Sequence, residues 1–176
     1  MGLLFGRKRI GLLRYYDLTK LSILVLEKHL LIRKLLTEVF DEFGIATVLS
    51  TPVPEIAFDI FMTHPVDIAI CDWTHELDGM AFLNRLRQDQ ESQNPFIPVI
   101  VCTANTEMGH VSTARDLGMT NYLSKPVSAK IIYLAICAVI EDHRPFIRTG
   151  SFFGPQRRHR RIVPYTGVER RISKII

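Results

Sequence analysis

The stretch that decides the fold is Val66-Asp67-Ile68-Ala69-Ile70-Cys71-Asp72, a short apolar run that ends in a carboxylate. Two later runs follow the same plan: Ile97-Pro98-Val99-Ile100-Val101-Cys102 precedes Thr103, and Asn121-Tyr122-Leu123-Ser124 precedes Lys125. Continuous apolar runs of this length are typical of strands buried on both faces of a parallel sheet. Because such a sheet gathers the carboxyl ends of its strands at one edge, we expect the three polar residues to converge. A carboxylate, a hydroxyl and an ammonium together can hold a phosphoryl group.

Strand-like and helix-like segments alternate from Leu21 onward. A first strand is predicted at Ile23 to Leu26, and a second at Ile45 to Leu49, with Ser50-Thr51 capping the helix that follows it. The helix between these strands has an apolar face at three-to-four spacing, made of Leu31, Ile32, Leu35, Leu36, Val39 and Phe40. Further helices are expected at about 79–88, 107–117 and 128–141. Five strand–helix units predict an α/β fold with a doubly wound five-stranded parallel sheet of the flavodoxin-like type, strand order 2-1-3-4-5.

The charges divide the chain into three parts. Acidic residues outnumber basic ones between Leu21 and Ile140, whereas the positive excess lies near the two ends. We therefore predict a basic N-terminal arm at 1–20, a globular domain at 21–142 and a basic, aromatic-containing C-terminal extension at 143–176. The three cysteines are scattered through apolar runs, so we expect reduced core thiols. No run reaches the roughly 20 residues of a membrane span, and we expect a soluble, cytoplasmic protein without a membrane partner.

Several landmarks of the chain occur in a familiar order. They are Ile23-Leu24-Val25-Leu26-Glu27, Asp72-Trp73 with Asp78-Gly79 shortly after, Thr103-Ala104, and Tyr122-Leu123-Ser124-Lys125-Pro126. Together they resemble the receiver domain of two-component response regulators, and the resemblance covers about Leu21 to Asp142. The extension resembles, more loosely, one found on some stand-alone bacterial receivers. The resemblance implies a signalling protein of a phosphorelay and not an enzyme, apart from self-catalysed phosphoryl transfer and autodephosphorylation.

The resemblance also implies roles for individual residues. Asp72 would be the phosphoacceptor, taking a phosphoryl group from a histidine kinase or a histidine phosphotransfer protein. Thr103 would hydrogen-bond the phosphoryl oxygens and Lys125 would pair with their charge, in keeping with a chemistry that depends on positioning and neutralisation. Tyr122 resembles the aromatic switch of such domains, or is simply a strand aromatic packed on a helix. The bond between Lys125 and Pro126 is a candidate cis peptide.

The predicted metal site departs from the family pattern. Receivers usually hold Mg²⁺ with two acidic residues after the first strand together with the phosphoacceptor, and here the pair reads Glu27-Lys28. The ligands would be Glu27, Asp72 and the backbone carbonyl of Thr74, and Lys28 weakens the site. Lys28 could take the place of the metal and pair with Asp72, or it could point to solvent beside a weakened site.

Three functions remain open at this point. The first is a receiver that acts through phosphorylation-dependent contact with a downstream protein. The second is a pseudo-receiver, a binding module that is never phosphorylated because Lys28 replaces a metal-binding carboxylate. The third is nucleic-acid binding through the basic arms, which we rank lower because the chain has no helix-turn-helix pattern and no zinc spacing. The alternative role for the C-terminal extension is structural: its aromatic side chains would pack it on the globular domain. These aromatics are Phe152, Phe153 and Tyr165. The kinase, the output partner and the oligomeric state are not encoded in any motif of the sequence.

Overall fold

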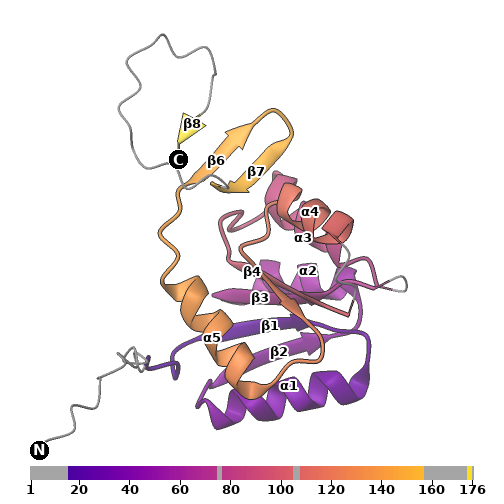
Figure 1. Ribbon diagram of the computed structural model, residues 1–176, viewed down its shortest axis with the longest axis vertical. Helices are drawn as coiled ribbons and strands as arrows, with labels where there is room; N and C mark the ends of the chain where they lie inside the picture. The colour runs from indigo at the N-terminus through magenta and orange to yellow at the C-terminus, as the bar shows by residue number, and fades with distance from the viewer. Residues whose placement is uncertain (1–15, 75–76, 105–107, 157–173, 176) are drawn as a thin grey trace, which may run out of the picture.

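A computed structural model describes residues 16–74, 77–104, 108–156 and 174–175. Its centre is a five-stranded parallel sheet with the order β2-β1-β3-β4-β5, as predicted (Figure 1). The strands are β1 (Ser22–Leu26), β2 (Thr47–Thr51), β3 (Ile68–Asp72), β4 (Val99–Thr103) and β5 (Asn121–Ser124). β1, β3 and β4 are buried along their whole length, which explains their continuous apolar sequence.

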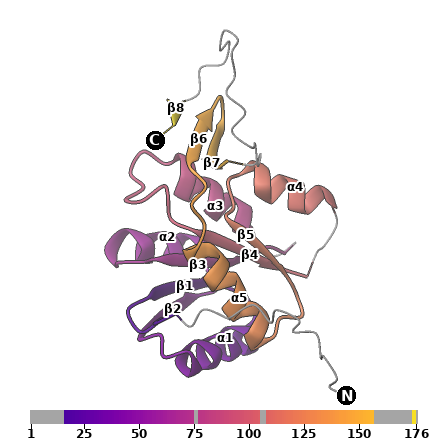
Figure 2. The same ribbon diagram turned by 60° about the vertical axis from the view of Figure 1, so that its left-hand side comes forward.

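Helices cover both faces of this sheet (Figure 2). They are α1 (Leu30–Glu42), α2 (Pro54–Thr63), α3 (Gly79–Gln88), α4 (Met108–Asp116) and α5 (Ala129–Ile140). α1 and α5 pack on one face, where Phe40 and Ile136 are fully buried. α2 and α3 pack on the other, where Phe58 and Leu83 belong to a second core cluster. Within the described residues, no helix is long and apolar enough to span a membrane.

The predicted start of the second strand was wrong. β2 begins at Thr47, because Ile45 belongs to the end of α1 instead. Gly44 takes a left-handed conformation with φ of 76°, and the Ile45 amide donates back to the carbonyl of Phe40. This pattern is a Schellman motif, in which the apolar residue after the glycine packs against the last helical turn. The apolar character of Ile45 therefore reflects helix capping and not strand formation.

Two helix predictions also need correction. Ser50 and Thr51 lie in β2 and do not cap α2, which begins at Pro54, a residue preorganised for the first helical position. On α1 the inner face is narrower than predicted. Leu36 and Phe40 are buried, but Leu31 is 79% exposed and Leu35 is 48% exposed.

The residues after α5 form a second, small sheet with the order β7-β6-β8. Its strands are β6 (Phe146–Thr149), β7 (Phe152–Pro155) and β8 (Lys174–Ile175), and both pairings are antiparallel. A two-residue turn, Gly150-Ser151, joins β6 to β7, with Gly150 at φ of 56°. This hairpin packs beside α3 through the buried ring of Phe153. Tyr165 and the ends of both basic arms lie outside the described residues.

Candidate functional site

The sheet register brings the predicted polar residues to one edge. Asp72 is the last residue of β3 and pairs in register with Cys102, directly before Thr103 at the end of β4. Thr103 pairs in turn with Ser124, directly before Lys125. The Lys125 amide donates to the Thr103 carbonyl at 2.9 Å, which extends the ladder by one residue. Parallel pairing alone therefore sets these side chains at the same edge.

Two carboxylates and one ammonium meet at this edge. The Lys125 Nζ lies 2.6 Å from Oε2 of Glu27 and 3.0 Å from Oδ1 of Asp72. The second oxygen of Glu27, Oε1, accepts a hydrogen bond of 2.8 Å from the backbone amide of His29. Glu27 thus follows β1 in a fixed orientation, and Lys125 bridges it to Asp72. The sequence predicted the approach of Lys125 to Asp72 but not its contact with Glu27.

Burial governs the electrostatics of the site. Asp72 and Glu27 are each 2% exposed, and Lys125 is largely covered. Burial raises the pKa of Asp72 above its ordinary value, and the positive charge of Lys125 offsets only part of that effect. Burial alone would lower the pKa of Lys125, but its contacts with Glu27 and Asp72 raise it overall. The site therefore favours a charged lysine beside a carboxylate that is costly to ionise.

Thr103 stands next to the phosphoacceptor candidate. Its side chain is fully buried, and its hydroxyl donates a hydrogen bond to the carbonyl oxygen of Trp73. Trp73 follows Asp72 directly, and its ring contacts the His110 ring of α4 in a tilted arrangement with the centroids 4.4 Å apart. Thr103 thus follows the residue that pairs with Asp72, so the two lie close together, as the sequence predicted. Its hydroxyl is hydrogen-bonded to the residue that directly follows β3.

A glycine lets α3 begin beside Asp72. Gly79 is the first residue of α3, and a Cβ at this position would collide with the backbone carbonyl of Asp72. Asp78 caps the helix, because its side chain accepts a hydrogen bond of 2.9 Å from the Ala81 amide. The sequence contained this Asp-Gly pair, but the close approach that requires the glycine becomes visible only in three dimensions.

The two residues of the Glu27-Lys28 pair lie in different environments. Glu27 is buried in the site, whereas Lys28 is exposed. The cation that contacts Asp72 is Lys125, so the ammonium of Lys28 does not take that position. The carbonyls of Glu27 and Lys28 both accept hydrogen bonds from Arg33 of α1, at 2.7 and 2.8 Å, which holds the loop after β1.

The donor set of the site is suited to a hard cation such as Mg²⁺. Both oxygens of Asp72 are buried, and among the described residues neither has an aligned hydrogen-bond partner. Glu27 adds a second carboxylate, and carboxylate and carbonyl oxygens are the ligands that Mg²⁺ prefers. The Thr74 carbonyl accepts a long hydrogen bond of 3.4 Å from the Leu77 amide. Within the described chain, no cluster of three or more acidic, histidine or cysteine side chains is available to a metal.

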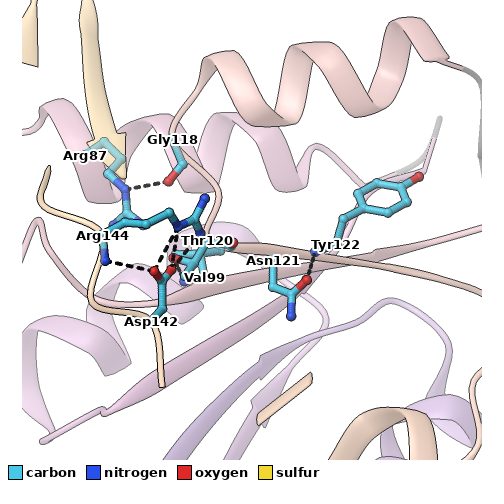
Figure 3. A network of polar contacts seen from close by, with 8 residues as sticks. All are labelled: Arg87, Val99, Gly118, Thr120, Asn121, Tyr122, Asp142 and Arg144. Atoms are coloured by element: carbon cyan, nitrogen blue, oxygen red, sulfur yellow. Dashed lines mark hydrogen bonds and ion pairs between the residues drawn. The ribbon is translucent and has the colours of Figure 1, made fainter. Parts of the chain in front are cut away.

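Tyr122 lies on β5, which β4 separates from β3 and the phosphoacceptor candidate. Its ring is half-buried and packs against the core cluster beneath α3 and α4, and burial raises the pKa of its hydroxyl. The backbone amide of Tyr122 donates to Oδ1 of Asn121 at 2.8 Å. Figure 3 shows the ring directed away from Arg144 and Asp142. The predicted cis peptide between Lys125 and Pro126 is confirmed.

Comparisons with known proteins agree with this geometry. Residues 23–136 match the model of the response regulator receiver domain family. The chain is 26% identical to a probable chemotaxis protein CheY of Rhizobium etli, over 68% of this chain and 92% of that protein. It is 30% identical to a protein-glutamate methylesterase/protein-glutamine glutaminase of Paraburkholderia xenovorans over 61% of this chain, but spans only 29% of that relative.

A solved structure has the same fold. The chemotaxis protein CheY4 of Vibrio cholerae superposes with a TM-score of 0.61 at 18% identity, covering 68% of this chain and 98% of that one. The doubly wound sheet with the order 2-1-3-4-5 places the chain in the same fold class as these chemotaxis proteins. The chain belongs to the response regulator receiver domain family of two-component systems. The domains of this family are generally signalling domains.

Proposed function

We propose that Asp72 accepts a phosphoryl group from a histidine kinase or a histidine phosphotransfer protein. The observation that carries the proposal is the buried carboxylate of Asp72 beside the ammonium of Lys125, 3.0 Å away. A carboxylate oxygen would attack the donor phosphorus, and the new O–P bond forms as the P–N bond of phosphohistidine breaks. The imidazole leaves with the electrons of that bond and keeps or gains a proton. Lys125 and the Thr103 hydroxyl would then neutralise and orient the phosphoryl oxygens.

Mg²⁺ would be held by Glu27, Asp72 and the carbonyl of Thr74. When bound, the ion neutralises phosphoryl oxygens and shields Asp72 from the approaching anionic donor. The ammonium of Lys125 lies between the two carboxylates, so it has to move away from at least one of them when the metal binds. The exposed Lys28 adds a like charge near the metal, so we expect weaker Mg²⁺ binding than a pair of acidic residues would give.

The output we propose is phosphorylation-dependent contact with a downstream protein, within a receiver unit at 21–142 that carries basic segments at 1–20 and 143–176. Support comes from the apolar outer face of α5, where Ile131 and Leu134 are 44% and 41% exposed. Tyr122 on the neighbouring β5 would switch its contacts with the state of Asp72. The contact surface then comprises α4, β5 and α5.

The rival proposal is a pseudo-receiver that never accepts phosphate. The bridge from Lys125 to Glu27 and Asp72 favours it, because both carboxylates already contact a cation without a metal. The two proposals separate in a titration with beryllofluoride, a phosphoryl mimic, at saturating Mg²⁺. Trp73 is the single tryptophan of the chain and adjoins Asp72, so its fluorescence reports binding. We expect saturable binding that Asp72→Asn abolishes, whereas absence of binding to the unmodified chain supports the pseudo-receiver.

Nucleic-acid binding is a third candidate, favoured by the charge distribution. Residues 143–176 carry nine basic side chains and one acidic one, whereas residues 21–142 carry eight basic and sixteen acidic ones. A nucleic acid held by the extension would show an affinity that falls steeply with salt and is lost on deletion of 143–176. Affinity that survives this deletion would remove the candidate.

A further inference from the structure

The C-terminal hairpin docks at the edge of the sheet opposite to Asp72. Phe153 of β7 is 1% exposed and packs edge-on against Phe96 with the ring centroids 5.3 Å apart, and Phe146 of β6 completes an aromatic cluster. The Gln88 side chain at the end of α3 donates to the Ser151 carbonyl at 2.9 Å. The hairpin lies beside α3 and α4 (Figure 1), and aromatic packing and a hydrogen bond attach it to the receiver.

The tightest part of this docking joins two glycines. A Cβ on Gly154 would lie 2.5 Å from the Cα of Gly118, and a Cβ on Gly118 would lie 3.2 Å from the Cα of Gly154 and collide with the Phe153 carbonyl. Only glycine permits backbones to approach this closely. Gly118 directly follows the last turn of α4 and has φ of 92°. The hairpin therefore rests on the carboxyl end of α4.

Arg87 contacts both Gly118 and the hairpin. Its side chain is 1% exposed, and its Nε donates to the Gly118 carbonyl at 3.0 Å, as Figure 3 shows. Its Nη1 donates to the Pro95 carbonyl at 2.8 Å, and its guanidinium lies 5.2 Å from the centre of the Phe146 ring. One buried side chain of α3 thus contacts the end of α4 and a ring of the hairpin.

α4 connects this docking site with the phosphoacceptor site. Near its amino end, the His110 ring contacts the ring of Trp73, the neighbour of Asp72. At its carboxyl end, Gly118 supports the hairpin. Among the described side chains of this nine-residue helix, which is roughly 13 Å long, Ala114 is the one that is fully buried. A helix with so little buried surface can shift at low cost.

A second connection runs through β5. The Arg144 Nη2, in the segment that leads into β6, donates to the Thr120 carbonyl at 2.8 Å and pairs with Asp142 at 2.6 Å (Figure 3). Thr120 and Val99 exchange two hydrogen bonds at the start of β4 and β5. Tyr122 follows two residues later on β5. The base of the hairpin is therefore attached to the strand that carries the candidate switch residue.

We propose that the hairpin β6–β7 is a docked regulatory element whose contact with Gly118 opposes the phosphorylated arrangement of the Asp72 site. This inference rests on the proposed function. A phosphoryl group on Asp72 offers the Thr103 hydroxyl a charged acceptor in place of the Trp73 carbonyl. Movement of Thr103 and Trp73 moves α4 at its His110 end, and Gly118 moves with the helix. Because the two glycines are already in backbone contact, a shift in either direction produces a clash or a gap.

The coupling is tested through its reciprocity. If phosphorylation weakens docking, loss of docking must strengthen binding of a phosphoryl mimic by the same factor. The variant Gly154→Ala places a methyl group against Gly118 and should undock the hairpin without touching the Asp72 site. Beryllofluoride is titrated into full-length protein at saturating Mg²⁺, with Trp73 fluorescence as the readout. We expect Gly154→Ala to bind at least about fivefold more tightly than the unmodified chain.

Ser151→Ala is the matched control, because Ser151 is exposed and its bond to Gln88 uses the backbone carbonyl. It should bind beryllofluoride like the unmodified chain. Equal affinities for Gly154→Ala and the unmodified chain would overturn the coupling and leave the proposed function intact. Absence of Asp72-dependent binding in all three proteins would instead overturn the proposed function, and the coupling with it.

Hydrogen exchange gives a second test, which uses only the unmodified chain and therefore does not depend on whether a variant folds. The Gln156 amide donates to the Pro145 carbonyl at 2.9 Å next to the hairpin, and the amides of β6 and β7 pair across it. Saturation with beryllofluoride should accelerate exchange of these amides at least about fivefold. Unchanged or slower exchange at saturation would contradict the proposal.

Discussion

The ammonium of Lys125 lies 3.0 Å from Oδ1 of Asp72, so the phosphoacceptor candidate is already paired with a cation in the absence of phosphate. The same ammonium contacts Glu27 at 2.6 Å. One lysine therefore contacts both of the buried carboxylates that a metal would bind. This shared position links the stability of the fold, the pH response of the site and its affinity for Mg²⁺.

Removal of Lys125 should destabilise the fold. Lys125→Met leaves Glu27 and Asp72 buried without their cation, and we expect a loss of about 3 kcal/mol in the free energy of unfolding at pH 7. The loss should shrink at pH 5, because Asp72, whose pKa is raised by burial, can then take up a proton. Urea unfolding at both pH values measures it, with Lys130→Met on the exposed part of α5 as the control. A loss no larger than that of the control would contradict the role of this bridge.

Ionisation of Asp72 should cost stability. Burial raises its pKa in the folded protein above the ordinary carboxyl value, so the folded state binds more protons than the unfolded state. Stability contributed by this group is then present at low pH and lost as the pH rises through the raised pKa. In Mg²⁺-free buffer, Asp72→Asn should be more stable than the unmodified chain at pH 7 by about 1 kcal/mol or more. The difference should vanish near pH 4, and a difference independent of pH would be the contrary result.

Two arginines on α3 should differ sharply in importance. Arg87 is buried and donates to the carbonyls of Gly118 and Pro95, so Arg87→Met leaves these groups without a donor and should cost about 3 kcal/mol. Arg85 is exposed, stacks on Phe58 and pairs with Asp89, and Arg85→Met should cost about 1 kcal/mol or less. Thermal unfolding of both variants gives the comparison. Equal losses would show that the contacts of Arg87 contribute little.

Restoring an acidic pair should strengthen Mg²⁺ binding. Lys28→Asp changes the charge beside Glu27 by two units, each worth about 1 kcal/mol at close range in water. Two units together amount to about 2 kcal/mol, so we expect the dissociation constant of Mg²⁺, read from Trp73 fluorescence, to fall by roughly thirtyfold. Lys34→Asp makes the same change on the exposed side of α1 and should have a much smaller effect. A similar gain in both variants would point to general electrostatics and not to a local ligand.

The parallel sheet and its polar edge were predictable because they follow from local sequence patterns. Apolar runs the length of a strand, separated by helical periods, determine the strand order, and strand order alone brings Asp72 toward Lys125. The second strand was misplaced because the apolar Ile45 closes a Schellman motif, which uses the same residue type as a strand. The apolar character of a single residue cannot distinguish a helix-capping position from a strand position.

Two other features, the buried arginine of α3 and the C-terminal hairpin, are indicated by the sequence but were not predicted. Arg87 falls on the apolar face of α3, in step with Met80 and Leu83, which marks a buried arginine. Gly150-Ser151 between two aromatic-containing runs is a hairpin signal, although no strand was predicted in the extension. The contact between Gly118 and Gly154 joins segments far apart in the chain, and no local pattern indicates it.

The most direct measurement is transfer of phosphate to the protein from a small phosphodonor such as phosphoramidate in the presence of Mg²⁺. Mass spectrometry of the intact chain and of its peptides locates the modification. We expect one added phosphoryl group, on the peptide that contains Asp72, and none on the Asp72→Asn variant. An unmodified chain at saturating Mg²⁺ and phosphodonor, or a phosphoryl group that persists in Asp72→Asn, would contradict the assignment of Asp72 as the phosphoacceptor.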